Sequence, residues 1–286
     1  FLISTQDSSV QMFYDITRVI KSQFKNAKTS FSVSNKKFYE SWIKENPEFV
    51  NFSQYILKEW EIISKIQNEE LDLKVLNSYE KRLGVEPELF GAIISDRRLF
   101  MGYKATFTQD YRRRFDDKTL LIILQKALII IDELFDKFKP NVVLSFQCVT
   151  IIDYIFYLFA REKKIRYVNL RPAKIENRVL FSSTINDPAP EILNAFNISL
   201  SNYIDDNKIN ISEKNFLDLY RKNDSLYEGV VKPSIQPTQK IKINSNILFK
   251  LINTLQNIFT FYYNKEYLDN HITNPLMKLL YIGILN

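Results

Sequence analysis

The segment between residues 138 and 181 restricts the fold more than any other part of this 286-residue chain. Residues 141–145 form a short apolar run directly after a proline, which is typical of a strand buried on both faces of a parallel sheet. Residues 146–162 then carry apolar side chains around most of a helical circumference, and residues 166–170 form a second apolar run. Because two parallel strands need such a crossover, the segment predicts a strand–helix–strand unit.

The beginning of the chain has the same arrangement. Residues 1–5 and 30–34 are predicted strands, and residues 10–24 between them have apolar side chains at a helical spacing. Two such units predict an α/β fold, with a Rossmann-like parallel sheet and flanking helices. The turn after the first strand lacks the G-x-G-x-x-G pattern, so a dinucleotide site of that type is not expected there.

The rest of the chain is predicted to add helices and one more strand. A third strand is predicted near residues 49–55, and Pro172 is expected to end regular pairing of the strand before it. Helices are predicted over residues 36–46, 59–83, 88–100, 117–138, 191–203 and 245–263. This organisation predicts a Rossmann-like α/β domain over residues 1–190 and a helical C-terminal extension with a linker over residues 191–286.

Composition excludes several kinds of functional site. Cys148 is the only cysteine and His271 is the only histidine, so neither a disulfide framework nor a metal cluster or catalytic triad built on histidine is expected. The formal net charge of +6 permits an anionic partner but does not require one. No stretch has the length and apolarity of a transmembrane helix, and the first residues lack the basic region of a signal peptide. A cytoplasmic protein is therefore expected.

Residues 95–115 form a basic stretch in which aromatic residues alternate with charges. Six cations stand against two acids, which gives +4 of the total +6: Arg97, Arg98, Lys104, Arg112, Arg113 and Arg114 against Asp96 and Asp110. Three interpretations are open: the stretch binds nucleic acid, it binds a phosphorylated or acidic small ligand through arginine, or it is the solvated face of helices whose aromatics pack inward. The small basic excess of the whole chain disfavours nucleic acid as a partner.

Candidate site residues occur in this stretch and beyond the predicted strands. Asp96 lies beside two arginines and would stay ionised. It would act as a base toward a sugar hydroxyl if the site removed water from it, and a structural ion pair is the alternative. Ligands of open α/β sheets bind beyond the carboxyl ends of the strands. Four further candidates follow the central strands: Gln147, Arg171, Glu176 and Arg178.

Several short motifs occur in a characteristic order between about residues 75 and 185. SYEKRLGVEPELFGAIISDRRL is followed by a long helical stretch, by FKPNVVLSFQ, and by AREKKIRYVNLRPAKIENRVLFSS. This order resembles bacterial surface- and capsular-polysaccharide biosynthesis proteins, which are two-domain proteins similar to GT-B glycosyltransferases. The resemblance implies a cleft lined by Asp96, Arg97, Tyr103, Arg112 and Arg171. Nothing after Pro190 predicts the second parallel α/β domain that holds the donor in GT-B enzymes.

The resemblance implies that the chain is the acceptor-side half of a glycosyltransferase in polysaccharide biosynthesis. A nucleotide-sugar would be the donor substrate and a saccharide the acceptor, with no metal and no permanently bound cofactor. The expected location is the cytoplasm, with peripheral contact at the inner face of the membrane. Two alternatives remain: a sugar-nucleotide epimerase of the same architecture, and a non-catalytic binding or scaffolding module of a polysaccharide-assembly complex that docks through its basic, aromatic surface and amphipathic helices.

Overall fold

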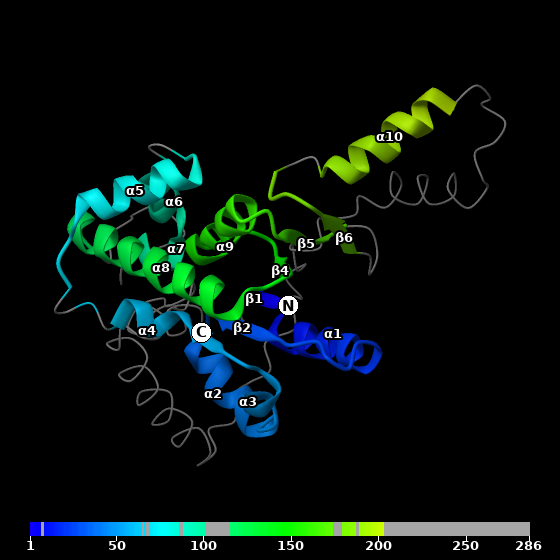
Figure 1. The fold of residues 1–286 in the computed structure, drawn as a ribbon, viewed down its shortest axis with the longest axis horizontal. Helices are drawn as coiled ribbons and strands as arrows, with labels where there is room; N and C mark the ends of the chain where they lie inside the picture. Colours follow the sequence, from blue (N-terminus) through cyan, green and yellow to red (C-terminus); the bar gives the residue numbers. More distant parts are fainter. Residues whose placement is uncertain are drawn as a thin grey trace, which may run out of the picture.

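A computed structural model describes residues 1–6, 9–64, 66, 69–85, 88–100, 115–173, 179–186 and 189–202 (Figure 1). These residues form an α/β fold around one mostly parallel sheet with the strand order β3-β2-β1-β4-β5-β6. The strands are β1 (Leu2–Thr5), β2 (Ser30–Val33), β3 (Ile56–Lys58), β4 (Val142–Phe146), β5 (Arg166–Pro172) and β6 (Val179–Ser182). The first five are parallel, and β6 runs antiparallel to β5. The predicted Rossmann-like fold class is confirmed.

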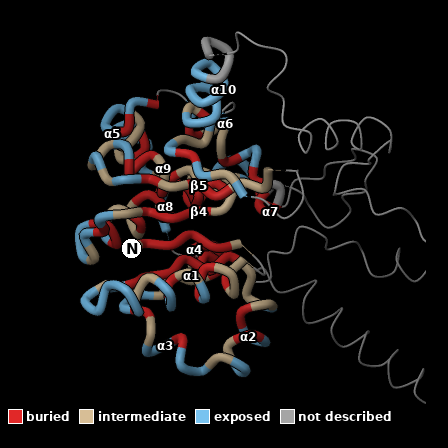
Figure 2. Tube along the Cα trace, turned by 90° about the vertical axis from the view of Figure 1, so that its right-hand side faces the viewer, coloured by how far each residue is buried: buried red, intermediate tan, exposed pale blue. Residues whose placement is uncertain are grey.

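Helices cover both faces of the sheet, and the buried residues lie between the layers (Figure 2). One face packs α1 (Ser9–Gln23), α2 (Lys36–Glu45) and α3 (Phe49–Phe52), whose side chains form an apolar cluster with Phe31 and Leu144. The other face packs α4 (Glu59–Ser64), α5 (Leu73–Leu83), α6 (Glu88–Ser95), α8 (Asp117–Phe138) and α9 (Ile151–Glu162). Phe135 of α8 contacts Phe156 and Phe159 of α9 at ring-centroid distances of 5.9 and 5.6 Å. This two-sided burial explains why β4 reads as a continuous apolar run.

The helix predicted over residues 146–162 begins later than its apolar pattern suggests. β4 continues through Phe146, and α9 starts only at Ile151 after the N-cap Thr150. The four residues between them, 147–150, form the loop at the carboxyl end of β4. The long helix over Asp117–Phe138 is confirmed at both ends.

The strand predicted near residues 49–55 is wrong. Phe49 begins the short helix α3, and its ring packs edge-on against Phe31 and Trp42 at centroid distances of 4.8 and 4.9 Å. The third strand is instead β3, which pairs Ile56 with Phe31. A short run of apolar residues is compatible with a single helical turn that buries one aromatic ring and also with a short strand. Periodicity cannot distinguish the two structures over so few residues.

Two predicted helices are each interrupted in the structure. The stretch 59–83 divides into α4 and α5, because the backbone at Asp72 is extended and its carboxylate caps α5 by accepting from the Lys74 amide at 2.8 Å. Gln125 of α8 holds this break by accepting from the Asp72 amide at 2.8 Å and donating to the Glu70 carbonyl at 3.0 Å. The stretch 88–100 divides at Asp96 into α6 and α7 (Arg97–Phe100).

The end of the sheet also differs from the prediction. β5 includes Pro172, which pairs with Val179 at the last position of an antiparallel ladder. The absent N–H of a proline is tolerated at such a terminal position. After β6 the chain enters α10 (Pro190–Asn202), where Ile192, Phe196 and Ile198 are exposed. The predicted helix over residues 245–263, and the extension beyond residue 202, lie outside the described residues. Among the described helices, none combines the length and apolarity needed to cross a membrane.

Candidate functional site

The strand order reverses direction between β1 and β4, which makes the carboxyl ends of these two strands the expected ligand site of the fold. The chain leaves β1 toward α1 on one face of the sheet and leaves β4 toward α9 on the other (Figure 1). We call this side of the sheet the carboxyl edge. Its loops carry Gln6 after β1 and Gln147 after β4.

Gln6 joins these two loops directly. Its side-chain amide donates to the backbone oxygen of Gln147 at 3.0 Å and also to the Asp153 carboxylate. The side chain therefore fixes the separation of the two loops at the point where the sheet changes direction.

Asp153 is fully buried at the start of α9 and is surrounded by hydrogen-bond donors. It accepts from the Ser4 hydroxyl at 2.6 Å and from the Thr150 hydroxyl at 2.8 Å. Asp153 and Thr150 also bond each other's backbone amides, which completes a capping box. Burial raises the pKa of Asp153 above its ordinary value, and the hydrogen bonds from Ser4 and Thr150 oppose that rise.

A buried ion cluster lies beside this helix end. The Arg98 guanidinium binds Glu59 through Nη1 at 3.0 Å and Asp96 through Nη2 at 2.9 Å. Arg98 is 5% exposed and both carboxylates are 1% exposed. Glu59 is the first residue of α4, directly after β3, and Asp96 lies between α6 and α7. Arg98 therefore links the start of α4 to the α6–α7 junction.

Glu59 is the carboxylate of the cluster that also contacts β2. It also accepts from the Ser32 hydroxyl of β2 at 2.9 Å. Burial raises the pKa of Glu59 to about 7, and the charge of Arg98 limits the rise. Glu59 therefore changes its ionisation near neutral pH inside the fold.

Asp96, the predicted base, has both oxygens occupied. Besides the Arg98 guanidinium, it accepts from the backbone amides of Arg98 and Ile151, each at 3.0 Å. To take a proton from a substrate, Asp96 would have to exchange one of these donors. The geometry fits the ion-pair alternative and adds a role that the sequence did not suggest, which is capping of α9 from the α6–α7 junction.

The N-terminus of α9 is consequently filled by groups of the protein itself. The amides of Thr150 and Ile151 bind the carboxylates of Asp153 and Asp96, and the amide of Asp153 binds the Thr150 hydroxyl. A helix N-terminus in this position of an α/β fold commonly receives a phosphate. Here two carboxylates already hold its amides, so a phosphate would meet negative charge rather than free donors.

Gln147 has the features of an available binding group. Its backbone adopts φ 40°, a left-handed conformation that costs a non-glycine residue energy and often marks a functional position. Its amide donates to the Leu170 carbonyl at 3.1 Å, which holds the loop on β5. The side chain is half-buried, and within the described part of the chain its amide group forms no hydrogen bond. The neighbouring Cys148 thiol stays protonated, because burial raises its pKa.

Arg171 is used mainly to organise the loop after β6. Its Nε donates to the Asn169 side chain at 2.8 Å. Its Nη2 donates to the carbonyl oxygens of Thr184 and Asn186 at 2.9 and 3.1 Å. Arg171 thus lies at the carboxyl edge, as predicted. Several of its N–H groups form hydrogen bonds with other residues of the chain.

The other predicted site residues fall outside what the structure describes. Arg97 begins α7, but its side chain is not among the described ones. Tyr103, Arg112, Glu176 and Arg178 lie in the segments 101–114 and 174–178, which are outside the described residues. Of the predicted set, the structure therefore places Asp96, Gln147 and Arg171 at the carboxyl edge.

Sequence reasoning did not select Gln6, Glu59 or Asp153. One of them carried a recognisable signal, because Thr150 followed by Asp153 ahead of an apolar helix is a capping-box pattern. Glu59 had no comparable signal, since its position depends on a strand that was predicted in the wrong place.

Within the described residues, no group of three or more histidine, cysteine, aspartate or glutamate side chains could hold a metal ion. Comparison with known proteins found no matching family model, no matching curated protein and no matching solved structure. The site is therefore interpreted from its own chemistry.

Proposed function

We propose that the chain is the acceptor-side, Rossmann-like half of a GT-B-like glycosyltransferase that builds a bacterial surface or capsular polysaccharide. The observation that carries this proposal is Gln147, whose half-buried side-chain amide lies in a strained loop at the switch point of the sheet and forms no hydrogen bond with the residues that the structure describes. A neutral amide that both donates and accepts is suited to the hydroxyl groups of a saccharide. The motif order between residues 75 and 185 supports the same assignment.

The charge of the carboxyl edge supports binding of the acceptor here and of the donor at a different site. The carboxylates of Asp96 and Asp153 hold the amides of the α9 N-terminus, which disfavours a phosphate there. A neutral saccharide acceptor fits this half, and the phosphates of the nucleotide-sugar donor would bind elsewhere. The same argument weighs against the epimerase alternative, which needs a nucleotide-sugar in this sheet's own site.

Calorimetric titration of the chain with neutral oligosaccharides and with nucleotide-sugars tests the proposal. Binding of a neutral oligosaccharide is expected, and Gln147→Gly should weaken it about tenfold through lost hydrogen bonds. Glycine accepts the left-handed backbone without strain, so this variant should remain folded. Gln54→Gly, at an exposed position in a loop at the opposite edge, is the matched control and should bind like the original chain.

Each other outcome contradicts the proposal in a recognisable way. Binding of a nucleotide-sugar that Gln147→Gly weakens would assign the donor to this sheet and favour the epimerase. An absence of binding by every saccharide and nucleotide-sugar would favour the scaffolding module.

A further inference from the structure

The amino ends of the parallel strands lie on the side of the sheet opposite the carboxyl edge. Because β2, β3, β4 and β5 are parallel, the loops that precede them meet on one side of the sheet. These loops are residues 24–29, 53–55, 139–141 and 163–165, and we call them together the amino edge. In Figure 2 the start of the chain marks this side and α7 marks the opposite one.

The amino edge and the first residue of β5 carry five exposed cations. Their side chains form no ion pair or hydrogen bond within the described part of the chain: Lys25, Lys28, Lys139, Lys164 and Arg166. The four loops contain no aspartate or glutamate. A positive charge distributed over several loops, without acids among them, creates a field that attracts an anionic surface.

Four acids in the last turns of α8 and α9 pair with cations other than these five. Lys163 binds Asp132 and Asp136 at 3.4 and 2.8 Å. Lys137 binds Glu133 at 3.2 Å, and Arg82 binds Glu162 at 3.1 Å. None of these pairs involves the five cations of the edge.

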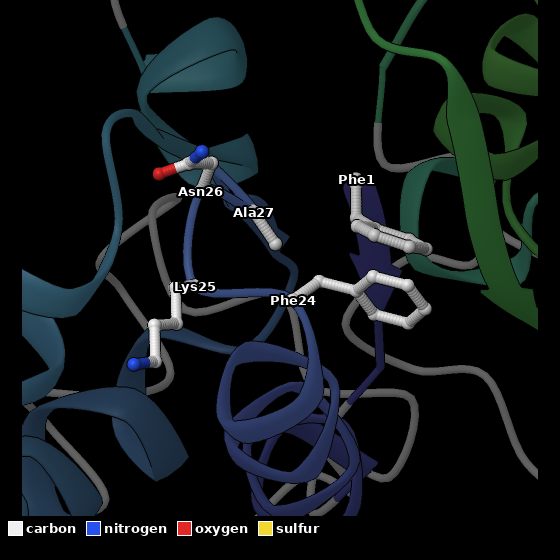
Figure 3. A pocket seen from close by; sticks show the side chains of 5 residues that line it. All are labelled: Phe1, Phe24, Lys25, Asn26 and Ala27. Atoms are coloured by element: carbon white, nitrogen blue, oxygen red, sulfur yellow. The ribbon is translucent and has the colours of Figure 1, made fainter.

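Apolar groups accompany the charges. Phe24 is 62% exposed and Tyr55 is 38% exposed. A shallow hollow of about 400 Å³ opens at the loop after α1, lined by Phe1, Phe24, Lys25, Asn26 and Ala27 (Figure 3). The rings of Phe1 and Phe24 lie near each other there, and Lys25 extends away from them (Figure 3). Aromatic rings bordered by lysines are suited to the headgroup region of a bilayer.

We propose that the amino edge docks on a membrane surface rich in anionic lipid. Five cations on one side of the sheet fall within the number that binds acidic headgroups, and each is expected to raise affinity about fivefold. Phe24 would enter the headgroup layer beside Lys25 and Lys28. Docking in this way directs the carboxyl edge away from the bilayer, so the proposal does not depend on the saccharide site. An exposed apolar ring beside a hollow fits lipid better than a phosphate backbone, which needs cations and stacking platforms along a groove.

Vesicle co-sedimentation of the full 286-residue chain tests this docking surface. Vesicles of phosphatidylglycerol and phosphatidylcholine should bind the chain at low salt, and vesicles of phosphatidylcholine alone should not. Added salt should release it, because exposed charges are screened. The double variant Lys25→Gln, Lys28→Gln should lower the partition coefficient by about twentyfold, and Phe24→Ser should lower it further.

The matched control removes the same charge elsewhere. Lys74→Gln with Lys118→Gln changes two exposed lysines away from the amino edge and should change partition by about twofold at most. Absence of vesicle binding, equal binding to neutral vesicles, or an equal loss in the control would overturn the proposal. Binding of a single-stranded RNA probe, lost in the Lys25 and Lys28 variant, without binding to vesicles would assign the edge to nucleic acid instead.

Discussion

At the scale of single residues, Arg98 is the buried cation of the carboxyl edge. It is the cation that lets Glu59 and Asp96 stay buried, with all three side chains at most 5% exposed. Burying two carboxylates is unfavourable unless they are paired and hydrogen-bonded. The sequence showed an arginine-rich stretch but could not show which arginine faces inward, because charged residues are usually solvated.

Arg98→Met is expected to destabilise the fold by about 3–5 kcal/mol, because it leaves two buried carboxylates without their cation. Urea unfolding of the variant and the original chain measures this difference. Arg18→Met is the control, since Arg18 is 64% exposed and pairs weakly with Asp15 at 3.9 Å. Its effect should remain within about 0.5 kcal/mol. Equal effects of the two substitutions would contradict the assignment of Arg98 as a structural cation.

The raised pKa of Glu59 predicts that the unfolding free energy depends on pH. Its pKa in the folded chain, about 7, exceeds the ordinary value of 4.5. The unfolded chain therefore releases this proton at lower pH than the folded chain does. The contribution of Glu59 is fully present below about pH 4.5 and is lost as the pH rises through about 7. Unfolding free energies measured across this range should fall less with pH in Glu59→Gln, and a parallel curve for the two proteins would contradict the raised pKa.

Asp96→Asn separates the two interpretations of Asp96. As an anchor, Asp96 pairs with Arg98 and caps α9, so the substitution should lower stability by about 2–4 kcal/mol through loss of a buried charge partner. If Asp96 is instead a general base, the substitution should abolish transfer and leave the unfolding free energy nearly unchanged. Thermal unfolding, measured beside any turnover assay, distinguishes these outcomes.

At the scale of secondary-structure elements, the start of α9 is the junction that organises the site. Its capping box, its contact with Asp96 and its contact with Gln6 all converge within one turn. An element held at one end by so many polar contacts keeps the preceding loop, including Gln147, in a fixed position.

Thr150→Ala should therefore lower the unfolding free energy by more than the loss of an ordinary N-cap does. The Thr150 hydroxyl accepts from the Asp153 amide and also donates to the buried Asp153 carboxylate. We expect a loss of about 2 kcal/mol in unfolding free energy. Asp116→Ala removes the cap of α8, where the Asp116 side chain is exposed, and should cost less than Thr150→Ala. A larger loss at Asp116 than at Thr150 would contradict this ranking.

Elements defined by contacts between residues close in sequence could be predicted, and elements defined by contacts between distant residues could not. The helix over Asp117–Phe138 and the strands β1, β2 and β4 were predictable, because burial imprints their periodicity on the sequence. The break between α4 and α5 depends on Gln125, which lies more than fifty residues along the chain from Asp72. The antiparallel strand β6 depends on pairing with β5 and has no strong local pattern.

At the scale of the whole molecule, the two ends of the parallel strands have opposite chemistry. The carboxyl edge contains buried carboxylates and the Gln147 amide, which has no hydrogen-bond partner among the described residues, and the amino edge contains exposed lysines and an exposed phenylalanine. The location of Gln147 and Arg171 at the carboxyl edge could be predicted from the sequence, because both residues come at the ends of predicted central strands. Ligands of such sheets gather beyond the carboxyl ends of the strands, so the candidate site follows from fold class. The ion cluster could not be predicted, since its members come from segments that only tertiary packing brings together.

Mapping of backbone amide shifts by nuclear magnetic resonance, during titration with a neutral oligosaccharide, shows whether the carboxyl edge binds a saccharide. Shifts are expected only at the carboxyl edge, at Gln6, at residues 147–151 and near Arg171, and the same titration of Gln147→Gly should give much smaller ones. A nucleotide-sugar should leave these amides unchanged. Shifts of the same amides by the nucleotide-sugar, or oligosaccharide shifts confined to residues 24–29 and 139–141, would contradict a saccharide site at the carboxyl edge.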